Sequence, residues 1–231
     1  MDYEIISAYK FTKIKNLQLL KSELYNFCKS NHIKGTIILA EEGINFTVSV
    51  TQKHLEKLIT FLKNFYLFED TKYTRYHSNK QPFNKLKVKI KKEIVKFGVQ
   101  NLDMSKKGIY IKSISWDRLI SQNDTVLIDT RNFYEYAMGT FLGALNPNIF
   151  YFSELSLWIK NTLIDKNSNI AMFCTGGIRC EKSTAYLRQL GFNNVYHLEN
   201  GILGYLKEYQ TKKNSKWKGK CFVFDDRVVY K

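Results

Sequence analysis

The order of strand-like and helical segments over residues 1–100 limits the possible folds of this chain more than any other feature. Apolar residues recur at strand spacing in YEIISAYKF, in both halves of IKGTIILAEEGINFTVSV, and in KYTRYHS and KLKVKIKKEIV. Between these strands, residues 16–31 and 51–66 carry apolar residues at helical spacing. The order is therefore βαββαβ with one extra strand. It predicts an α+β ferredoxin-like domain, in which two helices cover one face of an antiparallel sheet.

The second half of the chain has a different pattern, which predicts an α/β domain with a parallel sheet. Three short apolar runs, VLIDT, IAMFC and NVYHL, alternate with helical segments such as SELSLWIKNTL and RCEKSTAYLRQL. Strands that are apolar along their whole length are typical of a parallel sheet covered by helices on both faces. In such sheets, ligands bind where strands end and helices begin. Cys174, which ends IAMFC, lies at one of these points.

The domain boundaries follow from a lapse in these patterns around NLDMSKKGIYIKS. A chain of 231 residues with 44% hydrophobic residues can bury one large core or two modest ones. We therefore predict two domains, a linker and a C-terminal extension that contains a strand. Their ranges are 1–100 for the ferredoxin-like domain, 101–114 for the linker, 115–212 for the parallel-sheet domain and 213–231 for the extension.

Composition and cysteine usage indicate a cytoplasmic protein without a metal site. No run approaches the ~18 apolar residues of a membrane-spanning helix, and MDYEIISAYK lacks the cationic-then-apolar order of a secretion signal. The four cysteines form no disulfide framework and no paired CxxC motif. The four histidines form no cluster at metal-ligand spacing, and each is expected at the surface or in a loop. Cys28 is expected in the core, and Cys221 at the start of a strand that completes the fold.

A stripe of lysines stands out in the charge distribution. The net charge is +15, and residues 1–112 hold 21 Lys and Arg against 10 Asp and Glu. Alternation in KLKVKIK places Leu86, Val88 and Ile90 on one face of a strand. The opposite face then carries Lys85, Lys87, Lys89 and Lys91. Such a stripe predicts contacts with a nucleic-acid backbone. The alternative is a solvated face that reflects the use of 30 lysines against 6 arginines, and charge alone leaves both interpretations open.

The segment CTGGIRC carries the clearest chemical motif. Its loop runs from a strand into a helix and consists of Cys174, Thr175, Gly176, Gly177, Ile178 and Arg179. Glycines permit backbone geometries that turn successive N–H groups inward, and the helix N-terminus adds partial positive charge. These surroundings lower the pKa of a thiol and bind an anion carried on it, so Cys174 is predicted to be a thiolate nucleophile. The alternative is a buried core cysteine, which the glycine pair before an arginine disfavours.

The length of this loop distinguishes two chemistries. Four residues lie between Cys174 and Arg179, one fewer than in the loop of a cysteine phosphatase. The smaller cup suits a sulfur atom better than a tetrahedral phosphate. Together with LIDTRNFYEYAMGTFLGALN upstream and VYHLENGILGY downstream, CTGGIR resembles the active loop of rhodanese sulfurtransferases, over about residues 115–210.

The rhodanese resemblance also bears on the other polar residues of this region. It implies that Asp129, Arg131 and Glu135 mainly orient loops through charge-assisted hydrogen bonds, with a direct acid or base role as the less favoured alternative. Cys180 lies one residue beyond Arg179, inside the helix. A packed position is the favoured interpretation of this second thiol. The alternatives are a cap on the loop or a thiol that resolves an oxidised Cys174.

A narrower resemblance appears when both halves are taken together. The segments GTIILAEEGINFTVS, PFNKLKVKIKKEIVKFG, LIDTRNFYEYAMGTFLGALNPN, FCTGGIRCEKS and GKCFVFDDRV are similar to the rhodanese-domain tRNA uridine hydroxylases, over nearly the whole chain. The resemblance implies an acylphosphatase-like domain before a rhodanese domain, Cys174 as the active cysteine and tRNA as the partner. It also implies an oxidoreductase that forms 5-hydroxyuridine at the wobble uridine with molecular oxygen as co-substrate. No further cofactor motif is evident. Many members continue past FVFDDRV into a segment with more cysteines, and this chain is expected to act without it.

Two other functions stay open at this point. One is a rhodanese-type sulfurtransferase or persulfide carrier, which needs no RNA substrate. The other is an RNA-binding scaffold with an inactive loop, against which the intact Cys174 and Arg179 argue. If the lysine stripe does not hold RNA, KKNSKWKGK (212–220) is the second candidate surface, with Trp217 between lysines as a base-stacking platform.

Overall fold

The chain divides after Val95 into two units, Met1–Val95 and Lys96–Lys231. The computed structural model describes residues 2–65, 68–209 and 215–230. No helix within these ranges combines the length and the hydrophobicity that crossing a membrane requires.

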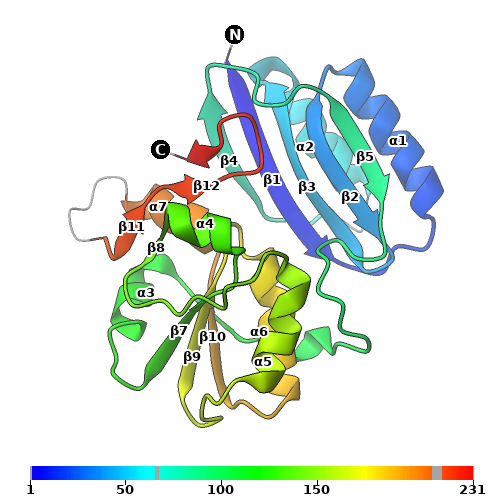
Figure 1. The fold of residues 1–231 in the computed structure, drawn as a ribbon. Helices are drawn as coiled ribbons and strands as arrows, with labels where there is room; N and C mark the ends of the chain where they lie inside the picture. Colours follow the sequence, from blue (N-terminus) through cyan, green and yellow to red (C-terminus); the bar gives the residue numbers. More distant parts are fainter. Residues whose placement is uncertain (1, 66–67, 210–214, 231) are drawn as a thin grey trace. The chain divides into compact units, whose positions relative to one another are not determined.

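The first unit is a five-stranded sheet with two helices on one face (Figure 1). Neighbouring strands run antiparallel except for β2 and β5, which are parallel. In spatial order the strands are β4 (Tyr73–Ser78), β1 (Tyr3–Phe11), β3 (Gly43–Thr51), β2 (Lys34–Ala40) and β5 (Leu86–Ile90). The helices are α1 (Leu17–Ser30) and α2 (Gln52–Asn64). This order confirms the predicted ferredoxin-like domain, with β5 as the extra strand.

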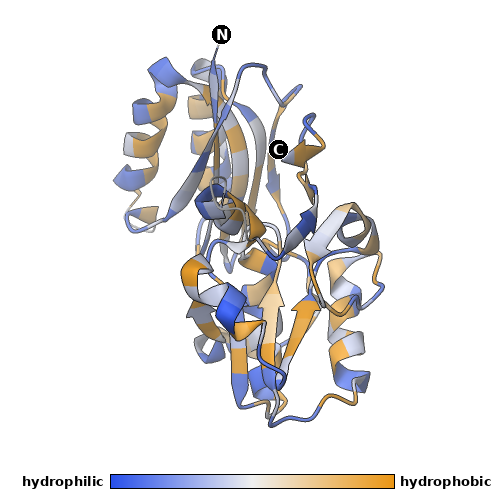
Figure 2. Ribbon diagram, turned by 90° about the vertical axis from the view of Figure 1, so that its left-hand side faces the viewer, coloured by the Kyte–Doolittle hydropathy of each residue, from blue (hydrophilic) through white to orange (hydrophobic). Residues whose placement is uncertain are grey.

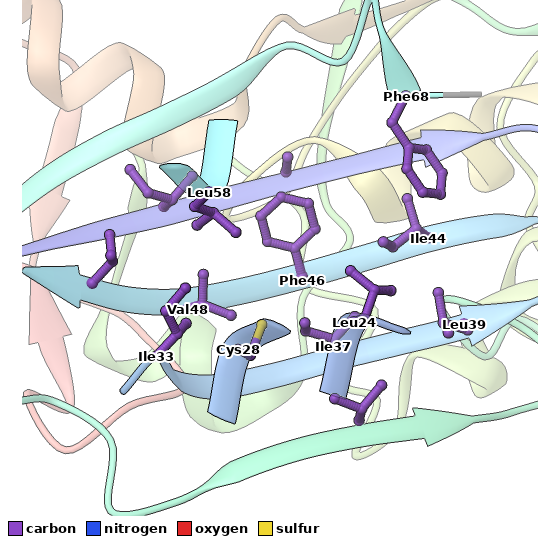
Figure 3. Close-up of a cluster of buried hydrophobic side chains, with 14 of the residues drawn as sticks. Leu24, Cys28, Ile33, Ile37, Leu39, Ile44, Phe46, Val48, Leu58 and Phe68 are labelled. Atoms are coloured by element: carbon purple, nitrogen blue, oxygen red, sulfur yellow. The ribbon is translucent and has the colours of Figure 1, made fainter. Parts of the chain in front are cut away.

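The core of the first unit lies between the sheet and the helices (Figure 3). Leu24 and Cys28 of α1, Leu58 of α2, and Phe46 and Val48 of β3 are all buried in it. They meet because the apolar residues of each helix recur at three- and four-residue spacing, whereas those of the strand alternate. Burial raises the pKa of Cys28 to about 12. This thiol is therefore an inert part of the core, as the sequence predicted.

The lysine stripe lies along β5, an edge strand of this sheet. Val88 is buried against the core, and the four lysines of the stripe are exposed: Lys85, Lys87, Lys89 and Lys91. Exposed lysines on an edge strand keep other strands from pairing with it, which is a structural role that needs no ligand. Exposure is thus as predicted, and RNA binding by these lysines stays a prediction.

The second unit is built around a parallel sheet of four strands (Figure 1). In spatial order they are β6 (Ile109–Ile111), β10 (Asn194–Leu198), β9 (Asn169–Phe173) and β7 (Thr125–Asp129). Figure 2 shows the hydrophobic colour in the sheet of this unit, as expected for strands covered on both faces. The helices are α3 (Ser113–Leu119), α4 (Phe133–Met138), α5 (Leu155–Asn161), α6 (Ile178–Gln189) and α7 (Gly201–Tyr209). Two 3₁₀ turns, η2 (Met104–Lys106) and η3 (Phe152–Glu154), complete it.

The segment 101–114, predicted to be a linker, is instead part of the second unit. It contains η2 and β6, and β6 pairs with β10 in the parallel sheet. The backbone N–H of Gly108 also donates to Thr184 Oγ1 of α6 at 3.0 Å. The sequence missed β6 because it is a three-residue edge strand whose Ile109 and Tyr110 are exposed, so that it shows no apolar alternation.

The C-terminal residues add short strands to this unit. β11 (Trp217–Gly219) pairs with β8 (Gly139–Phe141), and β12 (Cys221–Phe222) pairs with β13 (Val229–Tyr230). Where one strand was expected, the extension thus contains three short strands, β11, β12 and β13. β11 pairs with β8, which directly follows α4, and β12 contacts α4.

Candidate functional site

The CTGGIR loop connects the end of β9 to the start of α6. Cys174 directly follows β9, and α6 begins at Ile178. Gly177 has a φ of 98°, a left-handed value that glycine adopts without strain, and its N–H donates to the Cys174 sulfur at 3.1 Å. The backbone N–H groups of Arg179 and Cys180 also hydrogen bond to this sulfur. The sequence-predicted cup of N–H donors is therefore built around Cys174.

The start of α7 fixes the orientation of this cup. The N–H groups of Ile202 and Leu203 donate to the carbonyl oxygens of Cys174 and Thr175, at 2.9 and 3.1 Å. These carbonyls point toward α7, which leaves the loop N–H groups free to face the sulfur. Gly201 permits this packing, because a Cβ on it would lie 2.5 Å from the Cys174 carbonyl oxygen. Gly201 was not predicted from the sequence as part of the site, although the Asn-Gly pair in HLENGILGY is a turn signal.

A buried ion pair holds the far end of the loop. The guanidinium of Arg179 donates to both carboxylate oxygens of Glu135 on α4, at 2.6 and 2.8 Å. The Thr175 hydroxyl joins them, donating to Glu135 at 3.2 Å and accepting from Arg179 at 3.1 Å. Burial raises the pKa of the Glu135 carboxyl, but the Arg179 charge outweighs it, so this pKa lies below its ordinary value. Glu135 thus stays ionised and locks Arg179 in place.

The two thiols of this region have opposite acidities. Burial raises the pKa of Cys174, but the Cys180 S–H, the Arg179 charge and the loop N–H groups together lower it to about 6. Burial and the neighbouring Cys174 thiolate raise the pKa of Cys180 well above that of a free thiol. Near neutral pH, Cys174 is therefore a thiolate and Cys180 its neutral S–H donor. That Cys174 is the reactive thiol and Cys180 the secondary one stays a prediction.

Comparison with known proteins shows the family to which the chain belongs. Residues 3–94 match the UPF0176 acylphosphatase-like domain, and residues 115–208 match the rhodanese-like domain. A protein named tRNA uridine(34) hydroxylase from Wolbachia sp. subsp. Brugia malayi (strain TRS) is 49% identical over 99% of this chain and 85% of its own length. This chain belongs to the tRNA uridine(34) hydroxylase family. Relatives of the same name from Anaplasma marginale (strain St. Maries) and Teredinibacter turnerae (strain ATCC 39867 / T7901) are 45% and 46% identical. They are covered over 83% and 72% of their own lengths.

In this member of the hydroxylase family, a second buried ion pair lies between the end of β7 and β8. Arg131 donates to both oxygens of Asp129 at 2.9 and 2.7 Å, and neither side chain is exposed to solvent. The same guanidinium donates to the Gly139 carbonyl at 2.5 Å, and Thr140 donates to Asp129 at 2.9 Å. These bonds join the end of β7 to β8, across α4. Their geometry fits the orienting role that the rhodanese resemblance implies for this pair.

The other two cysteines near the loop pack into the fold. Cys180 lies 3.8 Å from the hydroxyl of Thr130 and is buried, as the favoured interpretation expected. Cys221 begins β12 and is buried, and this burial raises its pKa to about 12. Charges of Arg131 and Glu135 also act on Cys221, so it lies near the site although its thiol stays protonated.

Trp217 is not the base-stacking platform suggested for residues 212–220. It is buried, and its ring packs edge-on against Phe141 and over the guanidinium of Arg131. Its indole N–H donates to the Gly219 carbonyl at 3.0 Å. The ring is buried because β11 pairs with β8, and this pairing places the large apolar ring in the core. Lys212 and Lys213 of the same stretch lie outside the described residues.

His197 differs from the expectation that all four histidines lie at the surface or in loops. It lies on β10 and is buried, and its burial lowers its pKa to about 4. Its ring packs against Tyr110 of β6, with the ring centres 4.2 Å apart. Within the described ranges, no three His, Cys, Asp or Glu side chains are grouped to hold a metal ion.

Proposed function

We propose that this protein hydroxylates uridine 34 of tRNA to 5-hydroxyuridine, with Cys174 as its reactive residue. Membership of the tRNA uridine(34) hydroxylase family supports the reaction class. The observation that supports the residue is a buried thiolate of pKa about 6, inside a cup of backbone N–H donors. A sulfur nucleophile in such a setting is poised for covalent chemistry at neutral pH.

Each neighbour of Cys174 has a defined part in this proposal. The loop N–H groups and the Arg179 charge stabilise negative charge on the sulfur or on a group bound to it. Glu135 and Thr175 hold Arg179 in place through hydrogen bonds. Molecular oxygen is the co-substrate that the family resemblance implies, and tRNA is the partner. We place the reaction in the cytoplasm.

The exchange Cys174→Ser tests the proposal directly. It keeps the size of the side chain and removes the low-pKa sulfur, so 5-hydroxyuridine should disappear from the bulk tRNA of cells that carry only this variant. The matched control is Cys28→Ser, which makes the same exchange at a buried thiol in the core of the first unit. The assay is a nucleoside profile of digested tRNA. Wild-type amounts of 5-hydroxyuridine with Cys174→Ser would refute the role of this residue.

A second candidate function is a rhodanese-type sulfurtransferase or persulfide carrier without an RNA substrate. The observation that favours it is the short loop, in which only four residues separate Cys174 from Arg179 and the cup fits one sulfur atom. Intact mass measurement after incubation with thiosulfate distinguishes the two functions. A gain of one sulfur atom on Cys174, with an unchanged nucleoside profile in deficient cells, would favour the carrier.

A further inference from the structure

Five exposed aromatic side chains gather in the second unit around α4. We define the aromatic patch as these residues: Phe133, Tyr134, Phe150, Tyr151 and Phe224. Each has between 41% and 70% of its surface exposed. Exposed rings in such number are uncommon on a surface that contacts only water, because burying one ring is worth about 1.5–3 kcal/mol. An exposed apolar surface of this kind indicates a binding site.

Contacts within the unit hold the rings of the aromatic patch together. The backbone N–H of Phe133 donates to the Ile149 carbonyl at 2.7 Å, and the rings of Phe133 and Phe150 lie 6.4 Å apart. On the other side, Tyr134 packs edge-on against Phe222 at 5.3 Å, and Phe222 packs against Phe224 at 5.0 Å. Figure 1 shows α4 and β12 side by side, in agreement with their contacts. The ring contacts thus form two clusters that meet at α4, Phe133 with Phe150 and Tyr134 with Phe222 and Phe224, and Tyr151 adjoins the first cluster in the chain.

The backbone of the most exposed rings is fixed. The N–H groups of Phe150 and Tyr151 both donate to the carboxylate of Glu154, at 2.9 and 3.4 Å. Rings on a fixed backbone lose little conformational entropy when a planar ligand stacks on them. The backbone that carries Phe150 and Tyr151 is therefore held in place before any ligand stacks on their rings.

One short helix joins the aromatic patch to the reactive loop. Phe133 and Tyr134 directly precede Glu135 on α4, and the Glu135 carboxylate binds both Arg179 and Thr175 of the loop. A ligand that stacks on these two rings thus contacts α4, the helix whose Glu135 positions Arg179. Residues this close to the loop are well placed to orient the substrate of Cys174.

Positive charge borders the aromatic patch on the C-terminal side of α4. The N–H of Lys220 donates to the carbonyl of Met138, the last residue of α4, at 2.8 Å. The side chains of Lys218 and Lys220 are both exposed. Aromatic rings beside lysines match a nucleic-acid strand whose bases are unpaired, because the rings stack on bases and the lysines pair with phosphates.

We propose that the aromatic patch binds the unpaired bases of the tRNA anticodon loop and so presents the target uridine to Cys174. This inference rests on the proposed function and adds the surface that recognises the substrate. A base must leave its stack before an enzyme can act on it, which costs a few kcal/mol. Stacking of the neighbouring bases on Phe150 and Tyr151 offsets this cost, since each stacked base contributes about 1–3 kcal/mol.

The test replaces rings by an aliphatic side chain of similar size. Phe150→Leu and Tyr151→Leu keep an apolar surface but lose the π-face, whereas Phe150→Trp keeps it. Leu157→Ala is the matched control, an exposed apolar residue of the same unit outside the patch. Binding of an anticodon stem-loop RNA is measured by fluorescence anisotropy over a salt series. Each leucine variant should bind about 5- to 150-fold more weakly, at an unchanged salt slope, since 1.4 kcal/mol is a factor of ten.

The same variants in deficient cells separate this inference from the proposed function. Reduced 5-hydroxyuridine with the leucine variants, normal amounts with Leu157→Ala and Phe150→Trp, and an unchanged thiolate titration of Cys174 would support the aromatic patch. Full binding and full modification with both leucine variants, while Cys174→Ser gives none, would overturn the patch and leave the function standing. Weaker binding of a plain RNA duplex by the same factor would also overturn it, because a duplex offers no unpaired bases to stack.

Discussion

Removal of the Cys180 thiol is the sharpest perturbation of the site, because this group does no chemistry in the proposal and acts only on its neighbour. Burial raises the pKa of Cys174, and the largest opposing effect is the hydrogen bond from the Cys180 S–H. The pKa of about 6, against 9.0 for a free thiol, corresponds to about 4 kcal/mol in favour of the thiolate. A hydrogen bond to a charged group supplies about 1.5–3 kcal/mol.

Cys180→Ala is therefore expected to raise the pKa of Cys174 by roughly 1 to 2, since 1.36 kcal/mol corresponds to one pKa unit. At pH 7 the thiolate fraction would fall from about nine-tenths to between about one half and one tenth. Cys180→Ser keeps an O–H donor at the same place and should titrate near the wild-type midpoint. The Ala and Ser variants have nearly the same size, so packing is matched between them.

The assay is the ultraviolet absorbance of the thiolate over a pH series, with Cys174→Ser as the baseline to subtract. Absorbance needs no reagent to reach the buried sulfur, so it reports the closed state of the loop. Thermal unfolding of each variant checks that the fold is retained. If Cys180→Ala titrates at the same pH as wild type, then the S–H does not hold the thiolate, and only Arg179 and the backbone donors do.

Four other changes have defined outcomes. Arg179→Ala leaves Glu135 buried without its partner, so the free energy of unfolding in urea should fall by about 3–5 kcal/mol and the pKa of Cys174 should rise. Gly201→Ala should cost about 1–3 kcal/mol in the same assay, because its Cβ would lie 2.5 Å from a carbonyl oxygen, whereas a Cβ at Gly176 meets nothing within 4 Å and Gly176→Ala should be neutral. The folded pKa of His197, about 4, lies below its unfolded value near 6.5, so the unfolded chain binds the extra proton between these values. The free energy of unfolding should therefore fall by about 3 kcal/mol on account of this group as pH falls from 6.5 to about 4. His197→Gln should abolish this part of the pH dependence, and an unchanged pH dependence of unfolding would contradict the prediction. Replacing the lysine stripe by Gln should flatten the log-log salt dependence of tRNA binding by about 3 without changing stability, and equal slopes would assign only solvation to Lys85, Lys87, Lys89 and Lys91.

Features set by local spacing were predictable from the sequence. The strand and helix order of both units follows from apolar periodicity, because each element buries one face or one stripe. The CTGGIR loop was predictable because two glycines and a helix start fix its backbone within six residues. The preference for Cys174 over Cys180 follows from the same local geometry, since only the first thiol faces the N–H groups.

Features set by contacts between distant segments were not predictable in the same way. Trp217 looks like an exposed platform between lysines, yet the pairing of β11 with β8 carries it into the core. The packing of Gly201 on the loop and the pairing of Glu135 with Arg179 join residues that are 27 and 44 positions apart in the chain. β6 escaped notice because an exposed edge strand lacks the apolar alternation that marks a strand.

The complete burial of Cys174 has a consequence for the lifetime of the enzyme. A thiolate of pKa about 6 is the species that peroxides attack, and oxidation beyond the sulfenic acid is largely irreversible. Because the sulfur has no exposed surface, its oxidation rate is its intrinsic rate reduced by the small fraction of time for which the loop is open. Peroxide inactivation of the resting protein should therefore be slow for a thiol of this pKa, and it should become faster under conditions that open the loop.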